Sequence, residues 1–411
     1  MRKSELALRL KSHNQRIMLK NCEVSFNSFT GPFVAHKTPV IVLCDSLLRP
    51  EIYFELVEKT LKDRPLYVVD TCSFKIQSEP HLDTQQMTEI LIEWLDTMGI
   101  DRVILMGMGL SFPLAQRFAQ IQPTRCDRLI VAGVTGAVRD SVKLLINEQI
   151  EKLEKGNTRS FAKGLSYIFS NFNFKDKIDR AESYRMVFEQ YIRKLNSKML
   201  AHLKSDLKRF LDCANLYGTI ECQTLIIQAE YDSVCTINEG LQFAKRCLRS
   251  QLAILECLDH LAPVQNMKVL TRLLRRFLAD ESLGRMTGVE LYTKKSLPVH
   301  RMQMTPRYQF EQFGFLDSGN GVLIPVQIMD INRNGCRLYT TFTDHKDLRN
   351  CHHFTLSIPD RELEIEMILF SQDGNGNIRA VFVHDDNERF QKVNDAIELI
   401  AMEFDEAPIV A

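Results

Sequence analysis

Residues Val103–Ala119 read VILMGMGLSFPLAQRFA, and their pattern sets the expected fold for the first part of this 411-residue chain. The run Val103–Met106 is continuously apolar, as in a strand buried on both faces. Gly107 and Gly109 then permit a sharp turn, and apolar residues return at helical spacing from Phe112 onward. The stretch predicts a buried strand that turns directly into a helix, which is the repeating unit of parallel α/β sheets.

The same pattern recurs on both sides of this stretch. Apolar runs typical of buried parallel strands occupy residues 39–44, 66–70, 128–132, 224–228 and 251–255. Helical spacing of apolar residues occupies 84–98, 238–248 and 266–279. Strands that alternate with helices predict an α/β fold, a doubly wound and mostly parallel sheet with helices on both faces.

Changes in this pattern divide the chain into regions. We expect an α/β domain over residues 1–280, in which residues 139–218 show helical periodicity and almost no strand signal. An insert of that size at the carboxyl edge of a parallel sheet lies over the ligand crevice, so we interpret it as a helical cap. Residues 281–300 contain glycine and proline without clear periodicity and are predicted to be a linker.

A second domain is expected over residues 301–411. Strand-like runs separated by turns such as Asp373-Gly374-Asn375-Gly376 predict a small antiparallel β-barrel. A helical stretch at 393–404 is expected to close it. The apolar face predicted for that helix consists of Ala396, Ile397, Leu399 and Ile400.

Composition excludes several classes of protein. The chain is 45% hydrophobic and 25% charged, which is typical of a globular protein, and its formal net charge is zero. Neutrality argues against a generally basic nucleic-acid binder. No stretch approaches the roughly 20 consecutive apolar residues that a membrane helix needs. Residues 1–16 lack the apolar region of a secretory signal, so we expect a cytoplasmic protein.

The eleven cysteines are scattered, and no pair has Cys-x-x-Cys spacing. This usage is typical of reduced thiols in the cytosol. Cys351 precedes His352 and His353, but neighbouring side chains on a strand point to opposite faces. We therefore expect no metal site there, and no resident cofactor.

The order of elements in residues 20–280 resembles the α/β-hydrolase fold. That family carries its nucleophile in a Gly-x-Ser-x-Gly turn between a strand and a helix, and an acid and a histidine follow along the chain. Here Gly107 matches the first glycine, and Gly109 stands at the nucleophile position. Asp232, which ends the stretch LIIQAEYD, and His260 match the acid and the base. Glycine has no side chain that attacks a carbonyl, so the resemblance implies an incomplete triad.

Three routes to catalysis stay open. Ser111 or Cys44 would serve as a displaced nucleophile, or His260 with Asp232 would activate water directly. A hydroxyl at position 111 is also typical of a helix start, and a thiol at the end of an apolar strand is usually inert. The loop that usually supplies an oxyanion donor contains Asp45, whose charge repels a developing oxyanion if it faces the site. We expect a catalytically inactive scaffold.

Residues 301–411 resemble a PilZ domain, a small β-barrel with a following helix that binds the second messenger cyclic di-GMP. The family has two signatures, Arg-x-x-x-Arg ahead of the barrel and [Asp/Asn]-x-Ser-x-x-Gly on an early strand. Asp330, Asn332 and Gly335 match the second signature, with asparagine in place of serine. Arg307 fits the second arginine of the first signature. Its first position is a glutamine, and Arg301 lies two residues earlier.

The resemblance implies a ligand-binding role for these five residues. Arginine forks bind phosphate oxygens and guanine edges, an aspartate accepts from guanine N–H groups, and a glycine admits close approach of the backbone. The alternative is a structural turn at the end of a strand, because Asp, Asn and Gly all favour turns.

Charge is distributed unevenly along the neutral chain. Residues 301–411 contain 10 Lys+Arg against 18 Asp+Glu, a net charge of −8, so residues 1–300 carry +8. The expected cap, 139–218, has 16 against 10 and accounts for +6 of this excess. The distribution favours electrostatic docking of the cap on the acidic domain, or attraction of an anionic partner.

Taken with both resemblances, the sequence predicts a cytoplasmic bacterial regulator. Its hydrolase-like module is inactive, and its C-terminal domain responds to cyclic di-GMP in the control of motility or surface attachment. One alternative is an esterase or thioesterase that acts on acyl substrates under control of the C-terminal domain. The other is an interaction protein that needs no ligand.

Overall fold

A computed structural model describes residues 11–30, 37–47, 53, 64–74, 82–136, 138–171, 174–212, 218–298, 308–332, 335–383 and single residues between 392 and 400. The chain divides into two compact units. The first comprises Met1–Val138 and Phe169–Met302, and the second comprises Arg139–Ile168 and Gln303–Ala411.

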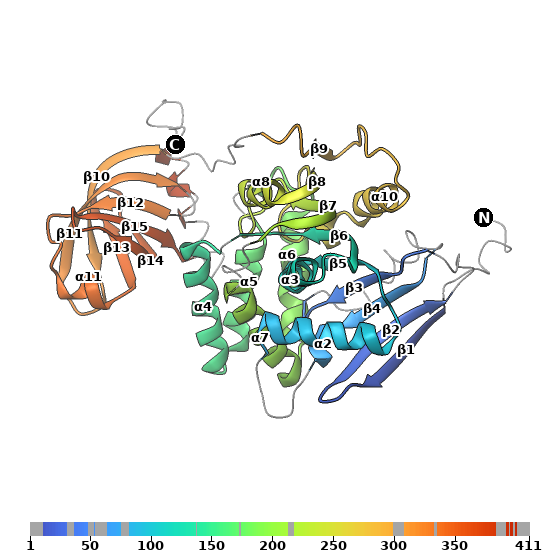
Figure 1. Ribbon diagram of the computed structural model, residues 1–411. Coiled ribbons are helices and arrows are strands. Elements are labelled where there is room, and N and C mark those ends of the chain that lie inside the picture. Colours follow the sequence, from blue (N-terminus) through green and yellow to red (C-terminus); the bar gives the residue numbers. More distant parts are fainter. Residues whose placement is uncertain are drawn as a thin grey trace. The chain divides into compact units, whose positions relative to one another are not determined.

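The first unit is built on a nine-stranded sheet of order β1-β2-β4-β3-β5-β6-β7-β8-β9 (Figure 1). Its strands are β1 Lys11–Met18, β2 Glu23–Thr30, β3 Val40–Cys44, β4 Leu66–Asp70, β5 Val103–Met108, β6 Cys126–Ala132, β7 Ile220–Ala229, β8 Cys247–Leu255 and β9 Val289–Thr293. The strands from β4 across to β8 pair in parallel, whereas β1, β2 and β9 add antiparallel edges. The predicted α/β class, with a mostly parallel sheet, is confirmed.

Helices cover both faces of this sheet, which is why β3 and β5 are buried along their whole length. The helices that follow the strands are α2 Thr84–Thr97, α3 Phe112–Ile121, α8 Ile237–Arg246, α9 Ala262–Gln265 and α10 Met267–Leu278. Leu270 of α10 shares a core cluster with Val68 of β4. Tyr67, the next residue, points to the opposite face, where its ring centroid lies 5.8 Å from that of Trp94 in α2.

The described elements of the predicted insert are all helices, namely α4 Asp140–Glu154, α5 Thr158–Phe169, α6 Ala181–Arg193 and α7 Ser197–Leu211. The helices of the insert are divided between the two units, however. Helix α4 and most of α5 belong to the second unit, whereas α6 and α7 belong to the first. The domain boundaries expected from the sequence, at residues 280 and 300, stay a prediction. Among the described residues, no helix has the length and apolar character to cross a bilayer.

Part of the expected linker, 281–300, forms a strand, and the bounds of the linker stay a prediction. Residues Val289–Thr293 form β9, which pairs antiparallel with β8. Val289 is buried and Leu291 packs against the core cluster, while Glu290, between them, faces the other way. Two alternate apolar residues in a five-residue strand are too few to stand out as a period in the sequence.

The second unit contains a closed, fully antiparallel barrel of order β10-β11-β12-β15-β14-β13. Its strands are β10 Tyr308–Asp317, β11 Leu323–Asn332, β12 Gly335–Tyr339, β13 His353–Ile358, β14 Leu363–Gln372 and β15 Asn377–Phe382, with a short helix α11 Lys346–Asn350. The predicted barrel is confirmed. Of the closing helix, Ile397 and Ile400 are buried in the barrel core as expected, but Leu399 is 58% exposed.

Candidate functional site

The turn after β5 has the tight geometry of a nucleophile elbow. Gly109 follows the strand directly and adopts φ +60°, a left-handed conformation that glycine reaches without strain. Gly107 lets α3 pack closely on the strand, because a Cβ there would lie 2.7 Å from Cβ of Ala115. The turn therefore keeps its shape while presenting no side chain at its apex.

The two displaced nucleophiles weighed from the sequence lie elsewhere. Oγ of Ser111 accepts a hydrogen bond from the backbone N–H of Met108 at 3.0 Å and lies 2.9 Å from the carbonyl oxygen of Leu43. The Ser111 hydroxyl therefore connects the turn after β5 to β3 by hydrogen bonds. Cys44 is fully buried at the end of β3. Neither residue is among the described side chains that line the cavity at the elbow.

The acid and base positions do come together. Asp232 lies in the loop after β7 and His260 in the loop after β8, and Nδ1 of His260 is 2.8 Å from Oδ2 of Asp232. The other carboxylate oxygen accepts from the backbone N–H groups of Val234 and Cys235, each at 2.8 Å. Burial lowers the pKa of His260, but the charge and hydrogen bond of Asp232 outweigh it and raise that pKa above its usual value.

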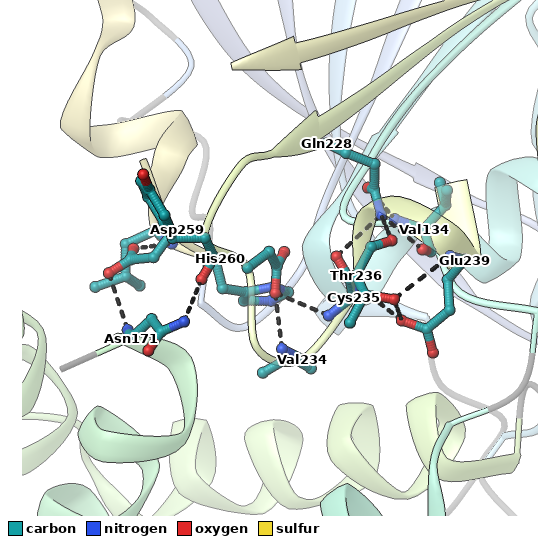
Figure 2. A network of polar contacts seen from close by, with 12 residues as sticks. Val134, Asn171, Gln228, Val234, Cys235, Thr236, Glu239, Asp259 and His260 are labelled. Carbon is teal, nitrogen blue, oxygen red and sulfur yellow. Dashed lines mark hydrogen bonds and ion pairs between the residues drawn. The ribbon is translucent and has the colours of Figure 1, made fainter. Parts of the chain in front are cut away.

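A second buried carboxyl, Asp259, adjoins this pair. It accepts hydrogen bonds from the backbone N–H of Leu261 at 2.9 Å and of Asn171 at 3.1 Å (Figure 2). Burial raises the pKa of Asp259 to about 6. Asn171 also donates from Nδ2 to the carbonyl of Tyr231 at 2.7 Å, so one residue of the insert ties together both loops of the site. The sequence contained no signal for this long-range contact.

Gln228, at the end of β7, holds the loop that carries the acid (Figure 2). Its Nε2 group donates to the carbonyls of Val134, Cys235 and Thr236 at 2.9–3.1 Å, and Oε1 accepts from the N–H of Val134 at 2.9 Å. Thr236 in turn caps α8, with Glu239 completing a capping box. The loop between β7 and α8 is therefore fixed at both ends.

Gly109, Asp232 and His260 line one cavity of about 270 Å³. Its walls are mostly apolar and include Phe169, whose ring stacks on the imidazole of His260 with centroids 4.8 Å apart. Phe188 of α6 contributes a second aromatic wall. A mostly apolar cavity with a few convergent polar groups is the usual form of a small-molecule site.

Known structures identify this architecture. MGS-M2, an α/β-hydrolase enzyme from a Medee basin deep-sea metagenome library, is 18% identical and superposes with a TM-score of 0.56 over 65% of this chain and 98% of that chain. An esterase from Thermogutta terrifontis, 17% identical, covers the same shares with a TM-score of 0.52. A hydrolase from Pseudomonas aeruginosa, also 17% identical, does so with 0.51.

The chain has an α/β-hydrolase fold. No family profile matches the sequence. A curated pig protein, 1-acylglycerol-3-phosphate O-acyltransferase ABHD5 (Sus scrofa), is 35% identical over 80 residues, which are 18% of this chain. Those residues span only about a quarter of that relative, 23% of its length.

In the α/β-hydrolase fold, the loop after the strand equivalent to β3 usually supplies an oxyanion donor. Here two amides of that loop, those of Ser46 and Leu47, already donate to carboxylates. The N–H of Ser46 donates to Oδ2 of Asp206 in α7 at 2.9 Å, and the N–H of Leu47 donates to Oδ1 of Asp45 at 2.8 Å. Asp206 is itself paired with Arg209. Asp45 lines the cavity, as the sequence suggested for its charge.

Metal-ligating atoms of Asp232, Cys235 and His260 lie within 4.8 Å of one another. The short 2.8 Å contact between Nδ1 and Oδ2 is a direct hydrogen bond. Two ligands that shared a tetrahedral zinc ion at about 2.1 Å would lie more than about 3 Å apart. The cluster is thus arranged as an ion pair.

The second unit holds the other predicted residues. Asp330 is buried on β11, and its Oδ2 lies 2.8 Å from Nη2 of Arg337 on β12. Oδ1 of Asn332 accepts from the N–H of Gly335 at 3.0 Å and closes the turn between these strands. A Cβ at Gly335 would lie 2.1 Å from the carbonyl oxygen of Ala380, so this glycine permits close strand packing.

Arg337 was not predicted from the sequence, although the turn places it opposite Asp330 in the strand register. Its side chain is 50% exposed. Arg301 and Arg307 lie outside the described residues. The structure therefore brings three of the five predicted ligand residues onto neighbouring strands and adds one arginine to them.

Proposed function

We propose that the α/β-hydrolase module is catalytically silent and binds a small ligand in the cavity beside His260. One observation carries this proposal. The apex of the elbow is Gly109, which lines the cavity next to a preserved acid–base pair. A base that has no nucleophile to deprotonate loses the covalent route, because the triad acts as a unit.

The loop after β3 supports the same conclusion. An oxyanion hole works by offering free donors to charge that develops in the transition state. The amides of Ser46 and Leu47 are occupied by carboxylates, and the charge of Asp45 opposes an oxyanion. The presence of the hydrogen-bonded pair of Asp232 and His260 is consistent with ligand binding, because both side chains line the cavity.

The alternative is an esterase or thioesterase, for which the named activities of the structural neighbours and of ABHD5 give a reason to test acyl substrates. The test measures hydrolysis of p-nitrophenyl butyrate and of a short acyl-thioester by the full chain and by His260→Ala. We expect the two proteins to give the same rate as buffer. A hydrolysis rate above buffer in the wild type that His260→Ala abolishes would refute the proposal that the module is catalytically silent. The variants Ser111→Ala and Cys44→Ala would then locate the nucleophile.

A second function is favoured by the arrangement in the barrel. Asp330 and the half-exposed Arg337 stand side by side next to the turn that Gly335 closes. A carboxylate beside an arginine fork suits a guanine edge and a phosphate. We therefore propose that the barrel of the second unit is a PilZ-type domain that binds cyclic di-GMP, with Arg307 contributing to the site, and that the protein is a cytoplasmic regulator of motility or surface attachment.

Calorimetry with cyclic di-GMP tests this second function. We expect heat with the wild type, and an affinity about ten- to a hundredfold lower for Arg307→Ala, the range expected for loss of one charge-assisted contact. Arg337→Ala is expected to weaken binding similarly. An absence of heat with the wild type would leave a ligand-independent interaction domain as the conclusion.

A further inference from the structure

The cavity beside His260 carries an excess of negative groups. Asp45, Asp232 and Asp259 all line it, and His260 is paired with Asp232. No lysine or arginine is among the described residues that line this cavity. A carboxylate ligand would enter next to three aspartates without a lysine or arginine to receive it, which costs affinity steeply in a site of low dielectric.

Aromatic rings make up another part of the lining. Phe169, Tyr184, Phe188 and Tyr191 come from the end of α5 and from α6. The hydroxyls of the two tyrosines donate to carbonyl oxygens of Gln265 and Ser46, at 3.2 and 3.4 Å, so these tyrosines offer the cavity mainly their rings. Aromatic faces attract organic cations, and ammonium ligands are commonly held by such rings together with carboxylates.

The mouth of the cavity is apolar. Val187 of α6 and Val264 of α9 both line it, and they are 64% and 36% exposed. The carboxyl groups of Asp45, Asp232 and Asp259 are all buried, so the polar part of the lining lies deeper than these two valines. A cavity of 150 Å³ holds a benzene molecule, so one of about 270 Å³ holds about ten non-hydrogen atoms.

We propose that this cavity binds an amphiphile with a protonated amine head and an apolar chain of medium length. The ammonium group lies among Asp45, Asp259 and the aromatic rings, and the chain leaves past Val187 and Val264. This inference rests on the proposed binding function and specifies its ligand. The proposed ligand is opposite in charge to the carboxylate anions that hydrolysis of an acyl ester would release.

The test compares octylamine, 1-octanol and octanoate, which share one chain and differ in head-group charge. Binding to the full chain is measured by calorimetry at pH 7.5, below the concentrations at which these probes form micelles. We expect octylamine to bind at least about a hundredfold more tightly than octanoate, with octanol between them. Equal or tighter binding of octanoate, or octanol binding as well as octylamine, would overturn the inference and leave the binding function standing.

Two variants locate the effect. Asp45→Asn keeps an oxygen for the Leu47 amide but removes a charge, and should weaken octylamine about tenfold with octanol unchanged. Phe188→Leu keeps an apolar wall and should weaken octylamine severalfold, again sparing octanol. Asp101→Asn, an exposed residue away from the cavity, is the charge-matched control.

Octanol binding shows that a variant still forms the cavity. Octylamine binding by Asp45→Asn that is as tight as in the wild type, with octanol also bound, would refute the charge argument. If none of the three probes binds the wild type, the proposed binding function falls, and this inference falls with it.

Discussion

Asp259→Asn gives a direct measure of how strongly the site is desolvated. Burial raises the pKa of Asp259 to about 6 in the folded protein, against 3.8 for the exposed group. The folded state therefore holds a proton that the unfolded state releases, so the carboxyl contributes stability at low pH that is lost as the pH rises through 6. A difference of about two pKa units between the folded and unfolded states corresponds to a contribution of about 3 kcal/mol to the unfolding free energy. About 2 kcal/mol of this contribution is lost between pH 4 and pH 7.

The chain contains its own reporter for this measurement. Trp94 is the single tryptophan, fully buried in the first unit against Phe26 and Tyr67, so its fluorescence follows unfolding of that unit alone. Urea titrations of wild type and Asp259→Asn at several pH values give the difference in unfolding free energy. We expect the wild type to lose about 2 kcal/mol relative to the variant between pH 4 and 7. Parallel stability curves would refute the reasoning, because they would mean that Asp259 ionises as an exposed carboxyl does.

Other predictions concern single contacts. In NMR titrations, the pKa of His260 should lie above 6.5 in the wild type and fall in Asp232→Asn, which loses the largest contribution opposing burial but keeps those of Asp259 and Asp45. The wild type should accordingly lose stability that the variant lacks as the pH rises through this pKa. Gln228→Leu removes four hydrogen bonds to Val134, Cys235 and Thr236, so the fluorescence titration should show a loss of about 3 kcal/mol or more in unfolding free energy. Gly335→Ala should destabilise the barrel by about 2 kcal/mol or more, seen as faster limited proteolysis, because its Cβ meets the backbone of a neighbouring strand; Gly374→Ala, with open space around it, should have no such effect.

The parts of the site found from the sequence share one property. Gly109, Asp232 and His260 each lie within five residues of the end of a buried parallel strand, so an apolar run and chain order suffice to locate them. The strands β1 and β2 were missed, because β1 reads KSHNQRIM and contains no clear alternation of apolar and polar residues.

The groups that complete the site were beyond the reach of sequence patterns. Asp206 and Asn171 come from the helical insert and bind loops 160 and 88 residues away in the chain. Helical periodicity reveals which face of such a helix is buried, but not which strand end it meets. The register that pairs Arg337 with Asp330 likewise follows from the length of a turn that composition alone does not fix.

The second unit is assembled from two distant segments, Arg139–Ile168 and Gln303–Ala411. During synthesis, α4 leaves the ribosome well before the strands of its own unit exist, so that unit is completed only after the whole sheet of the first has been made. The same discontinuity limits how the protein can be divided into fragments for expression. A fragment cut near residue 300 would retain α4 and the first part of α5 but lose the barrel of the same unit, so the natural unit for expression is the uncut chain.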